Sequence, residues 1–189
     1  MQEKTKARIM DATKIRRVLA RVATEIIEKN RNLKNLAIVG LKTRGITIGR
    51  RIARLIAVLE GVDIPVGIID ISRHRDDVPV ARAKASLETG DLLFTVDKKD
   101  ILLIDDVLMT GRTIRAAMDA LIERGRPQTI QLVVLIDRGH RELPIRPDYV
   151  GKVLPTSRRE VVRVRLREMD GADEVIIAEP VKLAGARKR

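Results

Sequence analysis

The sequence predicts an α/β fold with a mostly parallel central sheet and helices on both faces of that sheet. Short apolar runs bounded by Gly, Pro and charged residues alternate with segments whose apolar residues recur at helical spacing. Such alternation is typical of strand–helix–strand units, which build parallel sheets. The chain has 189 residues, enough for one full-sized core, so we expect residues 1–189 to form a single domain.

Each expected element follows from a local pattern. Asp11 is a suitable N-cap for a first helix that continues to about Asn30, and Gly61 is a suitable stop for a second helix. Helices are expected at 11–30, 46–59 and 112–125. Strands are expected at 36–40, 65–70, 92–96, 101–104, 130–136, 149–153, 161–166 and 174–178. Residues 71–91 are highly charged and lack a long apolar run, which indicates a mobile, functional loop, and the basic tail at 182–189 is expected to be frayed.

The composition excludes several classes of site. The chain has no cysteine, so it forms no disulfide, thiolate metal site or thiol nucleophile. No apolar run approaches the roughly 20 residues that a membrane-spanning helix needs. The N-terminal residues lack the apolar core of a signal peptide. We therefore expect a soluble, cytoplasmic protein without a membrane partner.

Positive charge is concentrated near the N-terminus. The net charge is +12, and residues 1–55 hold fifteen Lys or Arg against four acidic residues. This surplus indicates a polyanionic partner such as nucleic acid, although a charge-rich surface is also typical of thermophilic proteins. Phe94 and Tyr149 are the only aromatic residues, so base stacking on aromatic side chains is largely excluded. Any RNA binding must use Arg, Lys, polar side chains and the backbone.

The most informative segment joins an apolar run to a Gly/Thr turn. Residues 101–104 indicate a buried strand, Asp105 and Asp106 stand at its carboxyl end, and a Thr-Gly-x-Thr turn at 110–113 opens a helix. Ligands of open α/β sheets bind beyond the carboxyl ends of the strands. The turn offers N–H groups and hydroxyls to an anion, and paired carboxylates suit sugar hydroxyls or a hard cation. The segment predicts a phosphate and ribose site; the alternative is an ordinary turn with an exposed Asp pair.

A second loop repeats this chemistry. Lys42, Thr43 and Arg44 follow the expected strand at 36–40 and precede a helix. Glycine on both sides permits unusual backbone conformations, and the two basic side chains and free N–H groups face an anion. The alternative is a basic surface turn.

These segments resemble a known family. The segment at 101–113 resembles the signature of the type I phosphoribosyltransferases, which bind phosphoribosyl pyrophosphate (PRPP). The segment at 137–157 resembles the corresponding part of the bacterial pyrimidine operon attenuators, regulators that are also uracil phosphoribosyltransferases. The resemblance covers roughly residues 11–180.

The resemblance implies a type I phosphoribosyltransferase fold with a small hood, and transfer from PRPP to uracil that yields UMP and pyrophosphate. The implied catalytic residues are Asp105, Asp106 and Arg44, and Mg²⁺ bound with PRPP is the implied cofactor. The implied PRPP- and nucleotide-binding residues are Lys42, Thr43, Arg44, Asp105, Asp106, Val107, Leu108, Met109, Thr110, Gly111, Arg112 and Thr113. Many relatives have Tyr in place of Met109, so one hydroxyl is missing here. The hood over the base is implied to include Arg138 and Val162, and the mobile loop is implied to bring in Arg73, His74, Arg75, Asp76 and Asp77.

The resemblance also implies transcription attenuation through RNA. The RNA partner is a hairpin in the leader of pyrimidine (pyr) mRNA, bound in a manner that depends on UMP or UTP. The candidate RNA contacts are Arg16, Arg17, Arg21, Arg141, Arg146, Lys152, Thr156, Arg158 and Arg159. Arg163, Arg165 and Arg167 alternate with apolar residues and give a predicted strand a basic outer face. A homo-oligomer, either a dimer or a tetramer, is also implied.

Two other functions fit the same signature. A purine phosphoribosyltransferase, specific for hypoxanthine or guanine and without RNA binding, shares the segment at 101–113. A regulator with vestigial catalysis is a further possibility, although the intact acidic and basic loops argue against it. The segment at 137–157 is the feature that favours uracil.

Overall fold

The computed structural model describes residues 3–71 and 92–180. The predicted loop at 71–91 therefore lies outside the described residues except for Ile71, and the tail at 182–189 lies outside entirely. The helices are α1 (Ala12–Lys29), the 3₁₀ turn η1 (Leu33–Asn35), α2 (Arg44–Glu60), α4 (Arg112–Ile122) and α5 (Arg167–Asp170). The strands are β1 (Glu3–Met10), β2 (Leu36–Leu41), β3 (Val66–Ile69), β4 (Asp100–Leu108), β5 (Thr129–Asp137), β6 (Tyr149–Val153), β7 (Val161–Arg165) and β8 (Glu174–Pro180).

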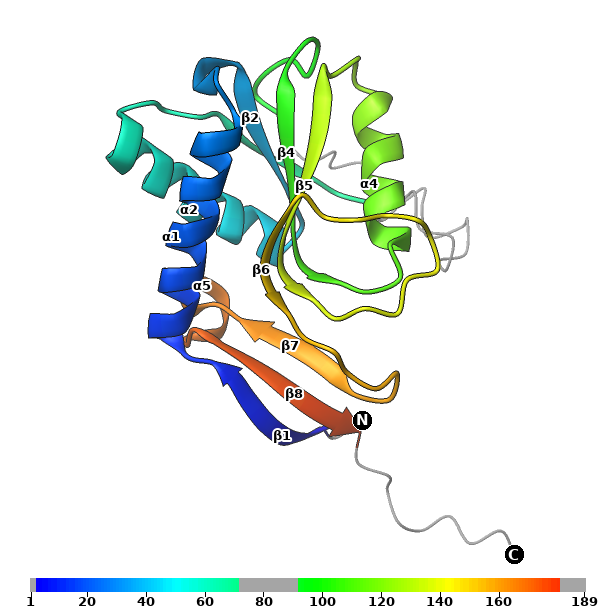
Figure 1. Ribbon diagram of the computed structural model, residues 1–189. Coiled ribbons are helices and arrows are strands. Elements are labelled where there is room, and N and C mark those ends of the chain that lie inside the picture. The colour runs from blue at the N-terminus through cyan, green and yellow to red at the C-terminus, as the bar shows by residue number, and fades with distance from the viewer. Residues whose placement is uncertain (1–2, 72–91, 181–189) are drawn as a thin grey trace, which may run out of the picture.

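The centre of the molecule is a five-stranded sheet (Figure 1). Its strand order is β3-β2-β4-β5-β6, and every neighbouring pair is parallel. All six residues of β2 are buried, as expected for a strand covered on both faces. The predicted α/β class and the parallel sheet are confirmed.

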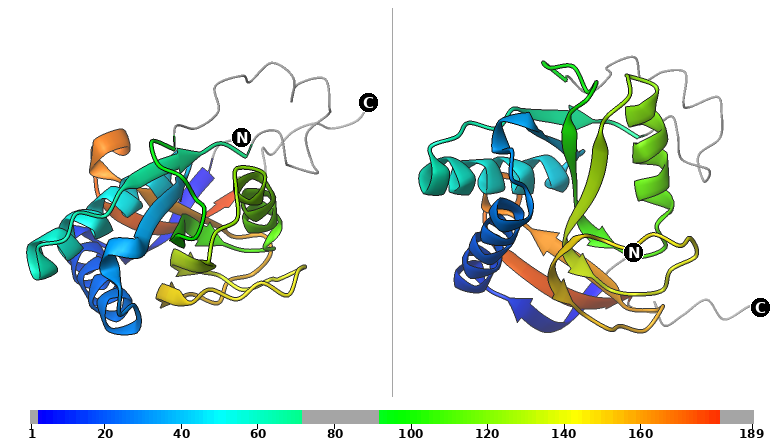
Figure 2. Two further views of the ribbon diagram at one scale, coloured as in Figure 1. Left: turned by 90° about the horizontal axis from the view of Figure 1, so that it is seen from above. Right: turned by 45° about the horizontal axis from the view of Figure 1, so that its top comes forward.

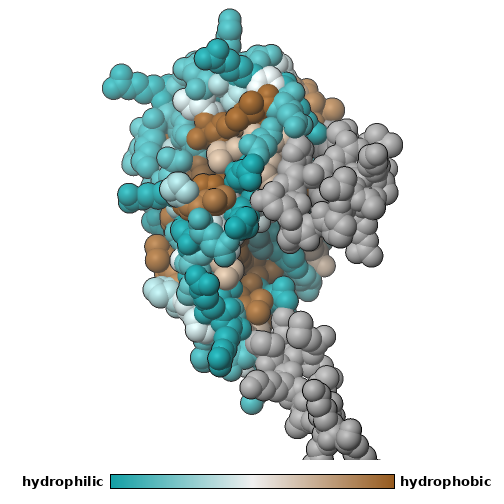
Figure 3. Space-filling view, turned by 90° about the vertical axis from the view of Figure 1, so that its right-hand side faces the viewer, coloured by the Kyte–Doolittle hydropathy of each residue, from teal (hydrophilic) through white to brown (hydrophobic). Residues whose placement is uncertain are grey.

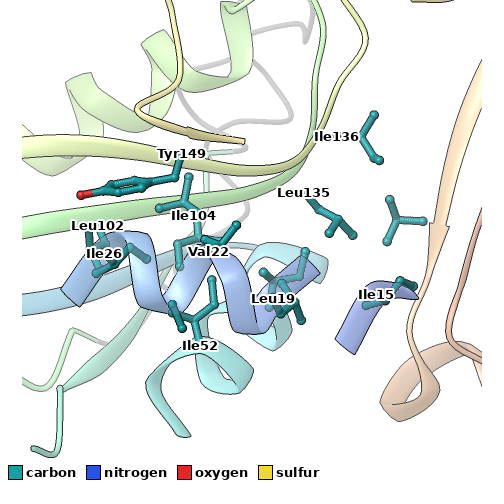
Figure 4. Packing of buried hydrophobic residues seen from close by; sticks show 14 of the residues in the cluster. Ile15, Leu19, Val22, Ile26, Ile52, Leu102, Ile104, Leu135, Ile136 and Tyr149 are labelled. Carbon is teal, nitrogen blue, oxygen red and sulfur yellow. The ribbon is translucent and has the colours of Figure 1, made fainter. Parts of the chain in front are cut away.

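Helices cover both faces of this sheet, as predicted. Helices α1 and α2 lie on one face and α4 lies on the other (Figures 1 and 2). On the first face the apolar stripe of α1 shares one core with the sheet, and Ile26 and Val22 lie on the side of Leu102 and Ile104 (Figure 4). The side chain of Asp11 accepts a hydrogen bond from the Lys14 N–H at 2.8 Å, which confirms the predicted N-cap.

Helix α4 buries its apolar residues against the opposite face of the sheet. Ile114, Ala117 and Leu121 pack with Leu103 and Val134 in a second core. The side of the molecule that carries α4 is mostly hydrophilic, with hydrophobic residues in small groups between the polar ones (Figure 3). In the described part of the chain no helix is both long and apolar enough to span a membrane.

A small antiparallel sheet lies beside the carboxyl end of the central sheet (Figure 1). Its strand order is β1-β8-β7. Val162, Val164 and Val175 turn inward and join the core beneath α1 and α2. Exposed Arg163 and Arg165 on β7 confirm the predicted basic outer face, whereas Arg167 falls in α5 rather than on the strand. This sheet carries Val162, one of the two residues implied for the hood, whereas Arg138 directly follows β5.

One predicted strand is absent, and two predicted ends were misplaced by three or more residues. Residues 92–96 form no strand in the described chain; instead the Thr95 hydroxyl accepts from the Asp97 N–H at 3.2 Å in a turn. Strand β4 does not end at 104 but continues to Leu108, because Asp105 and Val107 stay in register with β5. Helix α4 ends at Ile122, short of Gly125. The two acidic residues therefore lie within the last part of a strand rather than after it.

Strand β1 was not predicted. Its sequence carries Lys4, Lys6 and Arg8, and most of its described side chains are exposed. It pairs only with β8 and so lies at the edge of the small sheet. An edge strand rich in charge lacks the apolar alternation that identifies most strands.

Candidate active site

The start of α2 lies directly against the end of β4. A Cβ atom added to Gly45 would lie 2.3 Å from the carbonyl oxygen of Ile104, which is closer than any side chain permits. Glycine is therefore required for this close approach. The contact brings the basic loop at 42–44 beside Asp105 and Asp106, although the two segments are about sixty residues apart in the sequence.

Asp105 and Asp106 form a partly buried carboxyl pair. Oδ1 of Asp105 accepts from the Asp106 N–H at 2.9 Å, and Oδ1 of Asp106 accepts from the Val107 N–H at 3.0 Å. Burial and the neighbouring Asp106 raise the pKa of Asp105 well above its usual range. Burial also raises the pKa of Asp106, while its hydrogen bond with Asp105 and the positive charge of Arg44 act in the opposite direction. Strongly perturbed acids at the carboxyl end of a parallel sheet are typical of a functional site.

The basic loop offers cations on the other side of this pair. Lys42 and Thr43 are exposed and are joined by a cis peptide bond. The Lys42 ammonium lies 3.2 Å from Oδ2 of Asp70 at the end of β3. Arg44 begins α2, and its Nη2 donates to Oδ1 of Asp170 at 2.9 Å. The loop thus presents positive charge at the edge of the sheet where an anionic ligand would bind.

The turn at 109–113 leads from β4 into α4. Gly111 caps the helix in the left-handed conformation, with φ of 90°, and the Thr110 hydroxyl accepts from the Arg112 N–H at 3.3 Å. The first N–H groups of a helix have no acceptor within that helix and bind anions readily. Leu108 is fully buried in the α4-side core, so that residue can reach a ligand only through its backbone. The first turn of α4 thus offers backbone N–H groups at the predicted phosphate site, and phosphate binding there stays a prediction.

The segment after β5 holds this turn in place. The carbonyl of Thr110 accepts from the N–H groups of Glu142 and Leu143 at 3.0 and 3.1 Å. The Arg141 guanidinium donates to the carbonyls of Met109 and Ile145 at 2.9 and 2.8 Å. Arg141 is therefore occupied inside its own chain, although it was predicted as an RNA contact.

The two predicted hood residues are buried. The Arg138 guanidinium donates to the Thr156 hydroxyl at 3.1 Å and to the carbonyls of Ser157 and Glu160 at 2.9 and 2.7 Å. Burial lowers the pKa of Arg138. Val162 is packed in the core beneath α1 and α2. Arg138 thus fixes the turn before β7, and its contact with a base stays a prediction.

The remaining candidate RNA contacts either lie exposed at the surface or form hydrogen bonds with another part of the chain. Arg21 donates to the carbonyls of Val150 and Gly151 at 2.9 and 2.7 Å, which ties α1 to β6 near Lys152. Thr156 is occupied by Arg138. The exposed candidates without a hydrogen bond or ion pair to any described residue are Arg16, Arg17, Arg146, Arg158 and Arg159.

Some predicted groups have no structural description. Arg73, His74, Arg75, Asp76 and Asp77 lie outside the described residues. Within 3–71 and 92–180, no group of three or more His, Cys, Asp or Glu residues is arranged to hold a metal ion. A cation at this site would need most of its oxygen ligands from a bound substrate and from water, which is usual for Mg²⁺.

Comparison with known proteins identifies the family. A model described as a phosphoribosyl transferase domain matches residues 6–168. The chain is 51% identical over 178 residues to the Bifunctional protein PyrR of Deinococcus radiodurans, a match that covers 94% of this chain and 97% of that protein. This chain belongs to the PyrR family of phosphoribosyltransferases. The PyrR protein of Thermus aquaticus is 52% identical over 174 residues, with 92% of this chain and 96% of that protein covered.

Solved structures of more distant proteins share the fold. A hypoxanthine phosphoribosyltransferase of Staphylococcus aureus aligns with a TM-score of 0.68 and 20% identity over 93% of this chain and 94% of that one. The enzyme of Trypanosoma cruzi aligns with a TM-score of 0.72 and 17% identity over 95% and 94%. At these identities the likeness supports the type I phosphoribosyltransferase fold and says nothing about the base that a PyrR-family chain uses.

The sequence did not indicate the residues that support the predicted site through contacts with its side chains or backbone. Asp170 pairs with Arg44 and Arg141 supports Met109, yet neither was predicted in such a role. The turn at 167–173 carries charged residues without a recognisable motif. Its contacts with α2 join positions more than a hundred residues apart, so no local spacing could have indicated them.

Proposed function

We propose that this chain is a uracil phosphoribosyltransferase and also a UMP- or UTP-dependent regulator that binds the leader hairpin of pyrimidine transcripts. The observation that carries this proposal is the 51% identity, across nearly the whole of both chains, to a relative named Bifunctional protein PyrR. The carboxyl pair, the basic loop and the turn at 109–113 supply the chemistry that such a transferase requires.

The proposed reaction exchanges one bond at the anomeric carbon of the ribose. A uracil nitrogen forms the new bond while pyrophosphate leaves with the electron pair of the old C–O bond, and the uracil N–H proton is lost. Positive charge develops on the sugar as the pyrophosphate departs. Asp105 and Asp106 bind the ribose hydroxyls and stabilise that charge, so catalysis depends on positioning and electrostatics rather than on a covalent intermediate.

The anionic ends of PRPP are assigned to the two loops. The N–H groups and hydroxyls at 110–113 bind the 5′-phosphate, and Lys42, Thr43 and Arg44 bind the pyrophosphate. One oxygen of each Asp carboxylate accepts a backbone N–H, which leaves the other for a hydroxyl or a hard cation. Mg²⁺ bound with PRPP would be held at this acidic edge and would neutralise charge on the leaving group.

The base preference is tested by measuring pyrophosphate release with each base in turn. Wild-type protein is mixed with PRPP, Mg²⁺ and uracil, hypoxanthine or guanine. We expect kcat/KM to be highest with uracil. Higher values with either purine would support the alternative of a purine phosphoribosyltransferase, and binding of PRPP without turnover of any base would support a regulator with vestigial catalysis.

The RNA function is tested separately by a gel-shift titration. The probes are a pyrimidine leader hairpin from the source genome and a scrambled hairpin of equal length, each with and without UMP. We expect tighter binding to the leader hairpin and a further gain with UMP, because a co-regulator must bind the RNA-competent state more tightly. Equal affinity for both RNAs, unchanged by UMP, would mean that the basic surface binds polyanions without specificity for the leader hairpin.

A further inference from the structure

One stripe of α2 binds the turn at 167–173, which includes α5 and connects β7 to β8 of the small sheet. Arg44, Thr47 and Arg51 are spaced three and four residues apart and therefore lie on one side of the helix. Arg44 pairs with Asp170, the Thr47 hydroxyl lies 3.8 Å from the sulfur of Met169, and Arg51 pairs with Glu168 and Asp173. The turn at 167–173 is thus fixed to the helix whose first residue belongs to the basic loop.

The ion pair of Arg44 and those of Arg51 lie at different places along α2. Arg51 lies two turns into α2, and its guanidinium forms two hydrogen bonds with Asp173, at 2.7 and 3.1 Å. Arg44 is the first residue of the helix and lies close enough to Asp106 for its charge to affect that carboxyl. The Arg44–Asp170 pair therefore adjoins the predicted active site, whereas the Arg51 pairs lie further along the helix.

Asp170 is itself held in a defined position. Its Oδ2 accepts from the Leu166 N–H at 2.9 Å, while its Oδ1 accepts from Nη2 of Arg44 at 2.9 Å. Its side chain is 23% exposed and that of Arg44 is 33% exposed. A partly buried, backbone-anchored carboxylate is a rigid support for the long Arg side chain, which otherwise loses considerable rotamer entropy when it binds a ligand.

The pairing uses only part of the Arg44 guanidinium. Nη2 contacts Asp170, and Nε is buried without a hydrogen-bond partner among the described residues. Nη1 makes no hydrogen bond to a described residue. A guanidinium has five N–H donors in a planar fork, so one nitrogen can bind a fixed carboxylate while another binds an oxyanion.

We propose that Asp170, on the turn of the small sheet, is a positioning residue that holds Arg44 in the orientation needed to bind the pyrophosphate group of PRPP. This inference rests on the proposed function, because it assigns a supporting residue to the pyrophosphate side of that site. UMP lacks the pyrophosphate group, so the arrangement affects PRPP and leaves UMP unaffected.

The test compares Asp170→Asn with Asp173→Asn. Each variant removes one negative charge from the same turn and retains an oxygen that can accept the backbone N–H bound by the native carboxylate. The side chains are similarly buried, at 23% and 18% exposed. Asp173→Asn therefore reports the effect of weakening the turn, and only Asp170→Asn removes the ionic partner of Arg44.

Binding of PRPP, pyrophosphate and UMP is measured by calorimetry, and KM and kcat are measured with uracil. We expect Asp170→Asn to raise the Kd and KM for PRPP about three- to tenfold, with UMP affinity unchanged. Asp173→Asn should leave all three affinities close to wild type. Asp170→Glu should recover part of the loss, and the Arg44→Ala/Asp170→Asn double variant should bind PRPP no more weakly than Arg44→Ala alone.

Three results would overturn the assignment. Unchanged or tighter PRPP binding by Asp170→Asn would mean that the carboxylate does not support Arg44 or competes with the ligand for it. Equal losses in both Asn variants, or equal losses for PRPP and UMP, would indicate a general structural role of the turn. If the wild-type protein itself failed to bind PRPP, the proposed function would fail before this inference was reached.

Discussion

Nη1 of Arg141 donates to the main-chain carbonyl of Met109 at 2.9 Å, which links the segment after β5 to the turn that follows β4. The same guanidinium donates from Nη2 to Oδ2 of Asp137 at 2.6 Å. Burial favours the neutral acid at Asp137, but the hydrogen bonds from Arg141 and the Gly139 N–H hold its pKa below the usual value. Arg141 is thus a fixed, internal support of the predicted phosphate site.

Arg141→Ala should weaken PRPP and UMP by similar factors. Both ligands carry the 5′-phosphate, and loss of the Met109 contact loosens the turn that binds it. We expect Kd values about tenfold higher for each ligand by calorimetry, as is usual for loss of a charge-assisted hydrogen bond.

Arg146→Ala is the matched control for the same segment. Arg146 is exposed and has no hydrogen bond or ion pair with any described residue, so both nucleotide affinities should stay at the wild-type level. If Arg146 contacts an RNA phosphate, leader RNA binding weakens and the log–log salt slope falls by about 0.7–0.9. Unchanged UMP and PRPP binding in Arg141→Ala would contradict the supporting role of Arg141.

The carboxyl pair should reduce stability as the pH rises. In the unfolded chain each acid titrates near its ordinary pKa of 3.8, whereas burial raises both folded-state values. Between the two values the folded state binds more protons, so the free energy of unfolding decreases with increasing pH. Asp105→Asn should therefore melt at a higher temperature than wild type at pH 8, by about 2–4 °C for each kcal/mol added to the free energy of unfolding. This difference in melting temperature should shrink toward pH 4.

The same substitution should abolish most activity. An amide cannot stabilise developing positive charge as a carboxylate does, so we expect turnover to fall on the order of a hundredfold or more for Asp105→Asn and for Asp106→Asn. Asp63→Asn is the control, because Asp63 is exposed and without a described partner. Near-normal turnover in both active-site variants would refute the sugar-binding role. A lower melting temperature for Asp105→Asn at pH 8 would contradict the charge argument.

Arg44→Ala should weaken PRPP much more than UMP. Arg44 is assigned to the pyrophosphate, which UMP lacks, and we expect about a tenfold or greater loss for PRPP. Arg50→Ala removes a neighbouring charge from the same helix, where Arg50 is exposed and has no described partner. PRPP binding should be nearly normal in that control. Equal losses of PRPP and UMP affinity in Arg44→Ala would place this side chain elsewhere in the site.

The elements that could be predicted are those with a local cause. The cap at Asp11, the fully buried strand β2 and the Asp105–Asp106 pair each follow from residues that are close in the sequence. The charged strand β1 could not be recognised, because its partner β8 lies near the other end of the chain. The pairing of Arg44 with Asp170 could not be predicted for the same reason. The two residues are far apart in the sequence and meet only when the small sheet packs against α2.

Gly45→Ala should disturb both stability and PRPP binding. Inside a helix, Ala is normally more favourable than Gly by about 0.5–1 kcal/mol. Here the added Cβ would lie 2.3 Å from the Ile104 carbonyl oxygen and 3.4 Å from the Asp105 Cα, and neither backbone atom can rotate away. Because overpacking typically costs about 1–3 kcal/mol, the clash outweighs the helix propensity and the melting temperature should fall by several degrees.

Gly61→Ala separates this clash from the general effect of replacing glycine. Gly61 ends α2 with φ of 66°, and no atom lies within 4 Å of an added Cβ, so its substitution strains the backbone without a collision. It should lower the melting temperature by only about 2–4 °C, the shift expected for roughly 1 kcal/mol, and leave the KM for PRPP unchanged. Gly45→Ala should raise that KM as well, because the shift of α2 moves Arg44 away from Asp106. A Gly45→Ala protein with wild-type KM would show that the two loops are not held in register by this contact.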